Sequence, residues 1–324
     1  MRSAVVHHPG PPSALTIEDR EPPQPGDGEI AIDVAYAGVG FVDTLLRSGA
    51  FPLTPPFVPG IEVTGVVRAI GAGVAGFTVG RPVAALLNDF GRVQRAGGYA
   101  QVAIAHNSLA VDLPDDVDLP RITAALVNGV TAWLALRDIA RVDSADTVVV
   151  TGVGGGLGGT AVRLAALLPA RRVVGVVSHD PARAPAECTD VVLTGDIEAW
   201  SAGGEPVDVV IDSVGGRLRQ LLFEHLAPFG RLVVLGNASG EDVALSSDAA
   251  WHATSTVTGL SLGGIAHSHP GAVRAALRAV VDLVARGQLA EPMPDIQPLT
   301  RVSSVHEAIA DRSAPAKTVL DVAR

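Results

Sequence analysis

A glycine-rich loop carries the clearest chemical signal in this chain. The segment GVGGGLGG (152–159) directly follows the apolar run 147–151 and leads into the helix-prone run 160–168. Glycine lets the backbone turn tightly and approach a ligand closely, and a helix N-terminus offers unpaired N–H groups. Strand, loop and helix in this order predict a site for a dinucleotide pyrophosphate. The residues expected beside the phosphates are Gly154, Gly155, Gly156 and Leu157.

The residues after the next β-prone run, 172–177, bear on the type of dinucleotide. An NAD site usually has an acidic residue about 20 positions beyond the glycines, on the ribose hydroxyls. Here the run ends at a neutral serine, and Asp180 precedes Pro181, a pattern typical of a helix N-cap. This favours NADP(H) over NAD(H). The side chains expected to receive the 2′-phosphate are Ser178, His179 and Arg183.

The first 120 residues contain short β-prone runs separated by Gly and Pro clusters, with one short helix expected at 42–48. The β-prone runs are 3–6, 29–37, 61–69 and 100–104. This part of the chain therefore predicts a β-rich domain.

From residue 121 onward the pattern changes to helices alternating with continuous Val/Ile/Leu strands, which predicts a parallel sheet covered on both faces. The expected strands are 147–151, 172–177, 191–194, 207–211 and 231–235, with helices at 121–139, 156–168 and 216–226 and an edge strand within 252–262. The tail predicts helices at 271–286 and 303–311 and a strand at 318–322. The fold class is α/β: a Rossmann doubly wound parallel sheet (121–264) and a discontinuous β-rich domain (1–120 and 265–324).

Composition narrows the partners. The chain has 324 residues and a net charge of −10, so we expect neither nucleic acid nor an anionic membrane surface as a partner. The single cysteine, Cys188, excludes an intramolecular disulfide and a multi-cysteine zinc site. We find no apolar signal segment at the N-terminus and expect no spanning helix. These features predict a cytoplasmic protein.

Motifs along nearly the whole chain resemble those of a known family. They are AGVGFVDT (37–44), VPGIEVTG (58–65), GGYA (97–100), NGVTA (128–132), the glycine loop, DSVGG (212–216) and APFGRLV (227–233). In this order they resemble the zinc-free quinone oxidoreductase (zeta-crystallin-like) group of the medium-chain dehydrogenase/reductase superfamily. The resemblance implies a β-rich, GroES-like catalytic domain built from both chain ends and a Rossmann cofactor domain. It also implies NADPH-dependent reduction of a small-molecule quinone or other α,β-unsaturated carbonyl compound by a homodimer.

The resemblance bears on metal content too. Zinc alcohol dehydrogenases of the superfamily carry a Cys ligand near position 40 and a Gly-His-Glu motif near position 60, where this chain has Gly40-Phe41 and Gly60-Ile61-Glu62. A catalytic zinc needs about three protein ligands. We therefore expect no zinc.

Several site residues follow from the resemblance. Thr131 matches a position near the nicotinamide, although its hydroxyl could instead bond back to its own helix. Arg312 matches an arginine that reaches the 2′-phosphate, although it could equally be a surface residue. Gly40 stands where relatives often have Asn beside the nicotinamide, and Leu45 and Phe51 stand where they often have Tyr, which predicts a less polar pocket. Ligands bind at the C-terminal ends of the strands in parallel sheets. Three residues that follow such strand ends are therefore expected to flank the nicotinamide: Val214, Gly215 and Asn237.

Asp43 and Arg47 are the remaining candidates for a catalytic role. They could pair with each other or polarise the substrate, and a proton for the product would come from solvent. Two other functions stay open: a pathway-specific tailoring reductase for a bulky enone, and a poorly catalytic NADPH-binding sensor or structural protein.

Overall fold

The computed structural model describes residues 1–51, 53–87, 97–314 and 317–323. The chain divides into two compact units, which we call unit 1 (residues 1–127 and 263–324) and unit 2 (Asn128–Leu262). Unit 1 is thus built from both ends of the chain. The sequence analysis placed the domain boundaries after residues 120 and 264.

Unit 1 contains a seven-stranded, mostly antiparallel sheet in the order β14-β15-β3-β4-β5-β7, with β6 paired to β3. Its strands are β3 (Glu29–Val39), β4 (Glu62–Ile70), β5 (Pro82–Leu86), β6 (Val102–His106), β7 (Ala110–Asp112), β14 (Asp295–Pro298) and β15 (Thr318–Asp321). A separate two-stranded sheet holds β1 (Arg2–Val6) and β2 (Leu15–Asp19). Its helices are α1 (Phe41–Ser48), α8 (Pro270–Ala285) and α9 (Val302–Ala310), with α7 (Leu262–Ala266) at the boundary.

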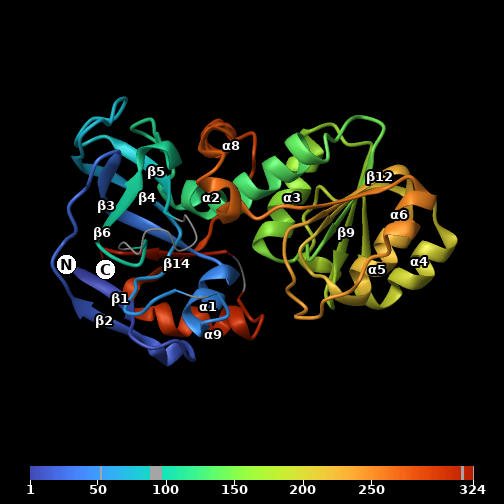
Figure 1. Cartoon of the computed structure of the whole chain (residues 1–324), viewed down its shortest axis with the longest axis horizontal. Helices are drawn as coiled ribbons and strands as arrows, with labels where there is room; N and C mark the ends of the chain where they lie inside the picture. Colours follow the sequence, from blue (N-terminus) through green and yellow to red (C-terminus); the bar gives the residue numbers. More distant parts are fainter. Residues whose placement is uncertain (52, 88–96, 315–316, 324) are drawn as a thin grey trace. The chain divides into compact units, whose positions relative to one another are not determined.

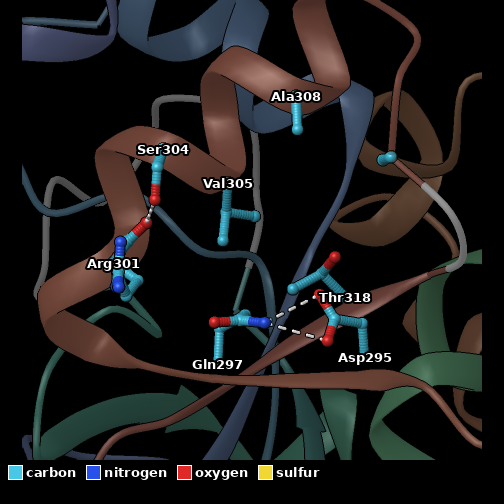
Figure 2. Close-up of a pocket in the computed structure, with 8 residues that line it drawn as sticks. Asp295, Gln297, Arg301, Ser304, Val305, Ala308 and Thr318 are labelled. Carbon is cyan, nitrogen blue, oxygen red and sulfur yellow. Dashed lines mark hydrogen bonds between the residues drawn. The ribbon is translucent and has the colours of Figure 1, made fainter.

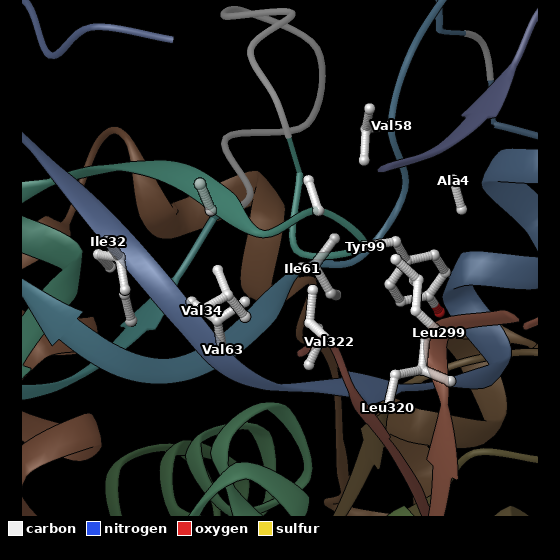
Figure 3. Close-up of a cluster of buried hydrophobic side chains, with 14 of the residues drawn as sticks. Ala4, Ile32, Val34, Val58, Ile61, Val63, Tyr99, Leu299, Leu320 and Val322 are labelled. Atoms are coloured by element: carbon white, nitrogen blue, oxygen red, sulfur yellow. The ribbon is translucent and has the colours of Figure 1, made fainter. Parts of the chain in front are cut away.

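The core of unit 1 joins residues that are far apart in sequence. Figure 3 shows Val34 of β3 and Val63 of β4 in the same cluster as Val322 from the end of the chain. Tyr99 and Leu320 are wholly buried in this cluster. Removing such apolar surface from water is the main stabilising contribution to folding, so the C-terminal strand is an integral part of this unit.

Unit 2 is a six-stranded parallel sheet in the order β10-β9-β8-β11-β12-β13. Its strands are β8 (Thr147–Thr151), β9 (Arg172–Val177), β10 (Asp190–Leu193), β11 (Val207–Asp212), β12 (Leu226–Val234) and β13 (Thr256–Gly259). All five residues of β8 are buried, as expected for a strand covered on both faces. In Figure 1, α3 (Gly156–Leu167) lies on one side of this sheet and α4 (Ile197–Gly203) and α5 (Gly216–Glu224) lie on the other. The predicted fold class is confirmed.

Helix α2 (Leu119–Trp133) continues into a π-helical segment, Leu134–Ile139. Together these 21 residues are long and apolar enough to cross a membrane by length and composition, but 67% of the most apolar window is buried within the structure. Burial of this extent is typical of a core helix.

The structure differs from the expected elements mainly where segments are short. Helix α6 (Ser247–Ala253) occupies the first part of the expected edge strand 252–262, because Ser246 caps it by accepting the Ala249 N–H. Strand β13 is therefore only four residues long. The elements that the sequence analysis missed are β2, β5, β7, β14, α4, α6 and α7.

Candidate functional site

The glycine loop of unit 2 is shaped by close backbone packing. A Cβ added at Gly158 would lie 2.4 Å from the carbonyl oxygen of Gly152, so this position admits only glycine. Helix α3 begins at Gly156 after Gly155, which supplies no side-chain cap, and its first turn has no acidic residue. The first amides of α3 are therefore available to an anion. The loop fits a dinucleotide pyrophosphate at Gly154, Gly155, Gly156 and Leu157.

A basic side chain lies beside this loop. The Arg183 Nη2 donates to the Gly154 carbonyl at 3.4 Å, and a Cβ at Gly154 would lie 3.3 Å from the Arg183 Cβ. The Asp180 carboxylate accepts the Ala182 N–H at 3.0 Å and so caps the 3-10 helix Pro181–Arg183. The interpretation of Asp180 as an N-cap is confirmed. The helical structure between β9 and β10 is this one turn.

Two further predicted residues, Ser178 and His179, are exposed directly after β9. They lie just before the turn that carries Arg183. Their contact with a 2′-phosphate stays a prediction.

A buried ion pair orders the strand ends of unit 2. The Asp212 carboxylate, which ends β11, accepts the Thr151 hydroxyl at 2.7 Å and the Val214 N–H at 3.0 Å. Its other oxygen accepts the Arg219 Nε at 2.6 Å, and Arg219 also donates to the Gly236 carbonyl. The Asp212 side chain is 0% exposed and the Arg219 side chain 7%. This pair therefore fixes both the loop after β11, which carries Val214 and Gly215, and the loop after β12, which carries Gly236 and Asn237.

Three residues predicted to flank the nicotinamide lie on these two loops. The Ser239 N–H donates to the Val214 carbonyl at 2.8 Å. Gly215 has φ +84°, and a Cβ there would lie 2.1 Å from the Asn237 Oδ1. The structure thus brings Val214, Gly215 and Asn237 together. Sequence reasoning missed Asp212 and Arg219 as their supports, although an acidic residue at the end of an apolar strand was a usable signal.

Thr131 lies on α2 and is 7% exposed. Within the described residues, its hydroxyl makes no hydrogen bond to the helix backbone, whereas the Thr123 hydroxyl donates to the Leu119 carbonyl at 2.7 Å. The helix-bonding alternative is therefore not observed, and the nicotinamide role of Thr131 stays a prediction.

In unit 1, Asp43 is held by backbone amides. Its carboxylate accepts the Gly40 N–H at 2.8 Å and the Gly60 N–H at 3.2 Å. Burial raises the pKa of Asp43 to about 6, against the opposing effect of these bonds. Of the two alternatives for Asp43 and Arg47, a pair between them is not among the described ion pairs, and a role toward the substrate stays a prediction. Gly40 is the N-cap of α1.

Arg47 belongs to a buried polar group that the sequence did not reveal. Its side chain is 5% exposed, and its Nε and Nη1 atoms have no hydrogen-bond partner. The Tyr99 hydroxyl lies 3.1 Å from the Nε2 of His306, and both residues are 0% exposed. Burial holds the pKa of Tyr99 well above its ordinary value, and burial followed by the charge of Arg47 lowers the pKa of His306 to about 3.

This group predicts an acid-dependent stability. Because the pKa of His306 is lower in the folded chain, its contribution is present above about pH 6.5 and is lost as the pH falls toward 3, at about 1.4 kcal/mol per pH unit. Asp43 acts in the opposite sense, since its raised pKa favours the folded chain below about pH 4 and disfavours it above 6. We expect His306→Gln to flatten the loss of Tm on acidification.

The matched variant is Asp43→Asn, which should make the loss of Tm on acidification steeper. Thermal unfolding followed by circular dichroism between pH 7 and 4 measures both slopes. Parallel profiles for the wild type and both variants would contradict the assignment.

A second cluster joins Glu62 of β4 to Lys317. The Lys317 Nζ lies 2.5 Å from the Glu62 Oε1, and the Val127 N–H donates to the Glu62 Oε2 at 2.7 Å. The described ranges contain no group of three or more His, Cys, Asp or Glu side chains that could hold a metal ion. The residues at the two zinc-ligand positions of the related dehydrogenases do not fit a zinc ion.

Arg312 follows α9 in a left-handed conformation, φ +57°. Its predicted contact with a 2′-phosphate stays a prediction. Nearby in unit 1, a cavity of about 190 Å³ lies between β14, β15 and α9. Figure 2 shows Gln297 donating to both oxygens of Asp295 at its floor. None of the predicted site residues lines this cavity.

Comparison with known proteins agrees with this architecture. Residues 26–115 match the alcohol dehydrogenase GroES-like domain, and residues 186–320 match the zinc-binding dehydrogenase domain. A probable quinone oxidoreductase from Schizosaccharomyces pombe is 33% identical over 241 residues, covering 71% of this chain and 70% of that protein. This chain belongs to the quinone oxidoreductase family of the medium-chain dehydrogenases/reductases. It is an oxidoreductase, and the predicted family is confirmed.

Two more relatives extend over almost the whole chain. A 2-haloacrylate reductase from a Burkholderia species is 28% identical over 346 residues, with 98% of each chain covered. The structure of Escherichia coli quinone oxidoreductase complexed with NADPH is 25% identical with a TM-score of 0.88, covering 99% of this chain and 100% of that one. Both units therefore have counterparts in the family.

Proposed function

We propose that this oxidoreductase transfers hydride from NADPH to a quinone or another α,β-unsaturated carbonyl compound, without zinc. The observation that carries the cofactor assignment is Arg183, which lies against the phosphate loop. It is supported by the neutral Ser178 at the end of β9, where an NAD site would have an acidic residue. When bound, the cofactor supplies the hydride. The glycine loop would bind the pyrophosphate, and Val214, Gly215 and Asn237 would orient the nicotinamide.

The acceptor class is supported by the relatives, one a quinone oxidoreductase and the other a reductase of a haloacrylate, which is itself a conjugated acid. The zinc-free mechanism is supported by the lack of ligands at Gly40 and Ile61. Strand β13, exposed at all four residues on the edge of the unit 2 sheet, supports a homodimer by strand pairing. We also propose a cytoplasmic location.

The decisive experiment is anaerobic oxidation of NADPH by the purified protein, with a simple quinone and an aliphatic enone as separate acceptors. NADH serves as the parallel donor, and a chelator-treated sample tests the zinc-free mechanism. We expect turnover with NADPH, much less with NADH, and no loss after chelation. NADPH binding without turnover of either acceptor would instead support a sensor or structural role.

Arg183→Ala tests the cofactor preference separately. Loss of a charge-assisted bond to the 2′-phosphate should raise the Kd for NADPH roughly 10- to 100-fold and leave NADH nearly unchanged. Arg312→Ala tests the second predicted phosphate contact in the same way. Arg217→Ala is the matched control, since this exposed arginine pairs only loosely with Glu198. Equal weakening of NADPH and NADH binding would contradict the phosphate assignment.

A bulkier acceptor is favoured by one observation. Phe41, the first residue of α1, is 47% exposed, and Phe51, which follows the helix, is 40% exposed. Exposed aromatic surface of this kind suits an apolar substrate, as in a tailoring reductase acting on a large enone. Comparing kcat/KM for a short-chain and a polycyclic enone separates this function from reduction of simple quinones.

A further inference from the structure

The charged cluster of unit 1 contains one ammonium group. The chain has 24 Lys and Arg residues, of which only Lys317 is a lysine. Its side chain is 12% exposed, although charged side chains are rarely buried unless they are paired. A buried lysine in an otherwise arginine-based sequence indicates a position that a compact ammonium fits and a planar guanidinium does not.

The pairing of β15 with β3 places this ammonium beside Gly40. Thr318 is opposite Val39 in the antiparallel register, so Lys317 follows opposite Gly40. A Cβ added at Gly40 would lie 3.8 Å from the Lys317 Nζ and 3.6 Å from the Asp43 Oδ2. Because Gly40 has no side chain, nothing at that position covers the ammonium.

Glu62 holds the ammonium in place. Its side chain is 1% exposed, and its two oxygens are used by the Lys317 Nζ and the Val127 N–H. A Cβ at Gly38 would lie 2.3 Å from the Glu62 Oε1, so the carboxylate packs directly on the bare backbone of β3. The carboxylate is thus fixed from two elements, and it fixes the cation in turn.

The ammonium keeps hydrogen-bonding capacity beyond this pair. It has three N–H donors, and among the described residues only Glu62 is a hydrogen-bond acceptor for it. Asp43 interacts with the ammonium through its charge. The positive charge of Lys317 favours the ionised carboxylate and so lowers the pKa of Asp43, against the larger effect of burial, which raises it. As far as the described part of the chain goes, two N–H groups are therefore left for a ligand.

We propose that Lys317 is a catalytic residue whose ammonium donates a hydrogen bond to the acceptor oxygen that becomes negative during hydride transfer. This proposal rests on the proposed function. The hydride, with two electrons, forms a C–H bond at the conjugated carbon, and the π pair of the C=C bond shifts so that the carbonyl oxygen becomes an oxyanion. A proton from water completes the reduced product, while the cofactor is oxidised by two electrons. A cation that is already fixed stabilises this charge without reorganisation.

The test compares Lys317→Met with the wild type under steady-state turnover of a quinone. We expect kcat to fall about 10²- to 10³-fold, with the Kd for NADPH little changed, and ethylammonium in the buffer to restore part of the rate. Arg68→Met is the matched control: its half-exposed pair with Asp33 joins β4 to β3, the two strands that also carry Glu62 and Gly38, and its kcat should not change. An unchanged kcat in Lys317→Met would overturn the proposal.

Lys317→Met leaves Glu62 buried without its cation, so the double variant Lys317→Met/Glu62→Gln is measured beside it. The amide that replaces the Glu62 carboxylate can still accept the Val127 N–H, and the double variant should fold while keeping the low kcat. Recovery of kcat in the double variant would show a purely structural role and overturn the proposal.

A binding measurement makes the proposal independent of turnover. 4-Nitrophenol, a coloured stand-in for the reduced oxyanion, is added to the complex with NADP+. We expect the wild type to increase the phenolate band and Lys317→Met not to do so, and equal bands would overturn the role of Lys317. An inactive wild type that still stabilises the phenolate would instead show that only the proposed acceptor class is wrong.

Discussion

Arg219→Ala is expected to destabilise unit 2 by about 3–5 kcal/mol, because it leaves the wholly buried Asp212 carboxylate without its cation. The same change frees the loops that carry Gly215 and Gly236. We therefore expect kcat/KM with NADPH to fall about 10²-fold even at temperatures where the variant is folded, since small displacements of positioning groups have effects of this size.

The matched control lies two residues away on the same helix. Arg217→Ala removes an arginine whose pair with Glu198 spans 3.5 Å and is more than half exposed on both sides, so its effect should stay within about 1 kcal/mol. Urea unfolding followed by tryptophan fluorescence measures both, because the chain's three tryptophans, Trp133, Trp200 and Trp251, all lie in unit 2. Equal midpoints for the two variants would contradict the role of the ion pair.

Gly60→Ala should have the second large effect, this time in unit 1. Gly60 has φ +96°, and a Cβ there would lie 2.8 Å from the Tyr99 backbone N and 2.9 Å from the Gly98 Cα. The left-handed backbone costs an alanine about 1–2 kcal/mol, and displacement of a packed backbone adds about 1–3 kcal/mol. The variant should also weaken the Gly60 N–H bond that holds Asp43.

Gly80→Ala separates these two contributions. Gly80 has φ +85° in the same unit, but a Cβ there meets nothing within 4 Å, so only the backbone contribution of about 1–2 kcal/mol is expected. Both tyrosines, Tyr36 and Tyr99, lie in unit 1. Urea unfolding followed by fluorine NMR of fluorotyrosine-labelled protein therefore reports on this unit, and a Gly60→Ala loss no larger than that of Gly80→Ala would show that the close contact is not limiting.

The sequence predicted unit 2 well because its information is local. Strand β8, the glycine loop and α3 are consecutive, and continuous Val runs such as 172–177 identify strands buried on both faces. Short strands such as β7, with three residues, have no comparable pattern. They are set by pairing with distant segments, which a single sequence does not reveal.

In the candidate site too, the residues that belong to local motifs were predicted, whereas contacts between distant segments were not. Gly154, Arg183 and Val214 were predicted from motifs, and the structure places them on the loops expected. For Asp43 the sequence left a pair with Arg47 and a role toward the substrate open, and it did not reveal that backbone amides of Gly40 and Gly60 hold the carboxylate. The roles of Lys317, Tyr99 and His306 were not found at all, since each joins its partner across more than 200 residues of chain.

Unit 2 is one continuous stretch, whereas unit 1 is completed only by β15 (318–321), which follows unit 2 in the chain. During synthesis, unit 2 is therefore able to fold on emerging from the ribosome, while β3 still lacks its β15 neighbour. An unpaired strand edge attracts other chains. Until Lys317 and β15 have been synthesised, the nascent chain accordingly has a complete parallel sheet in unit 2, an open sheet edge at β3 and no lysine.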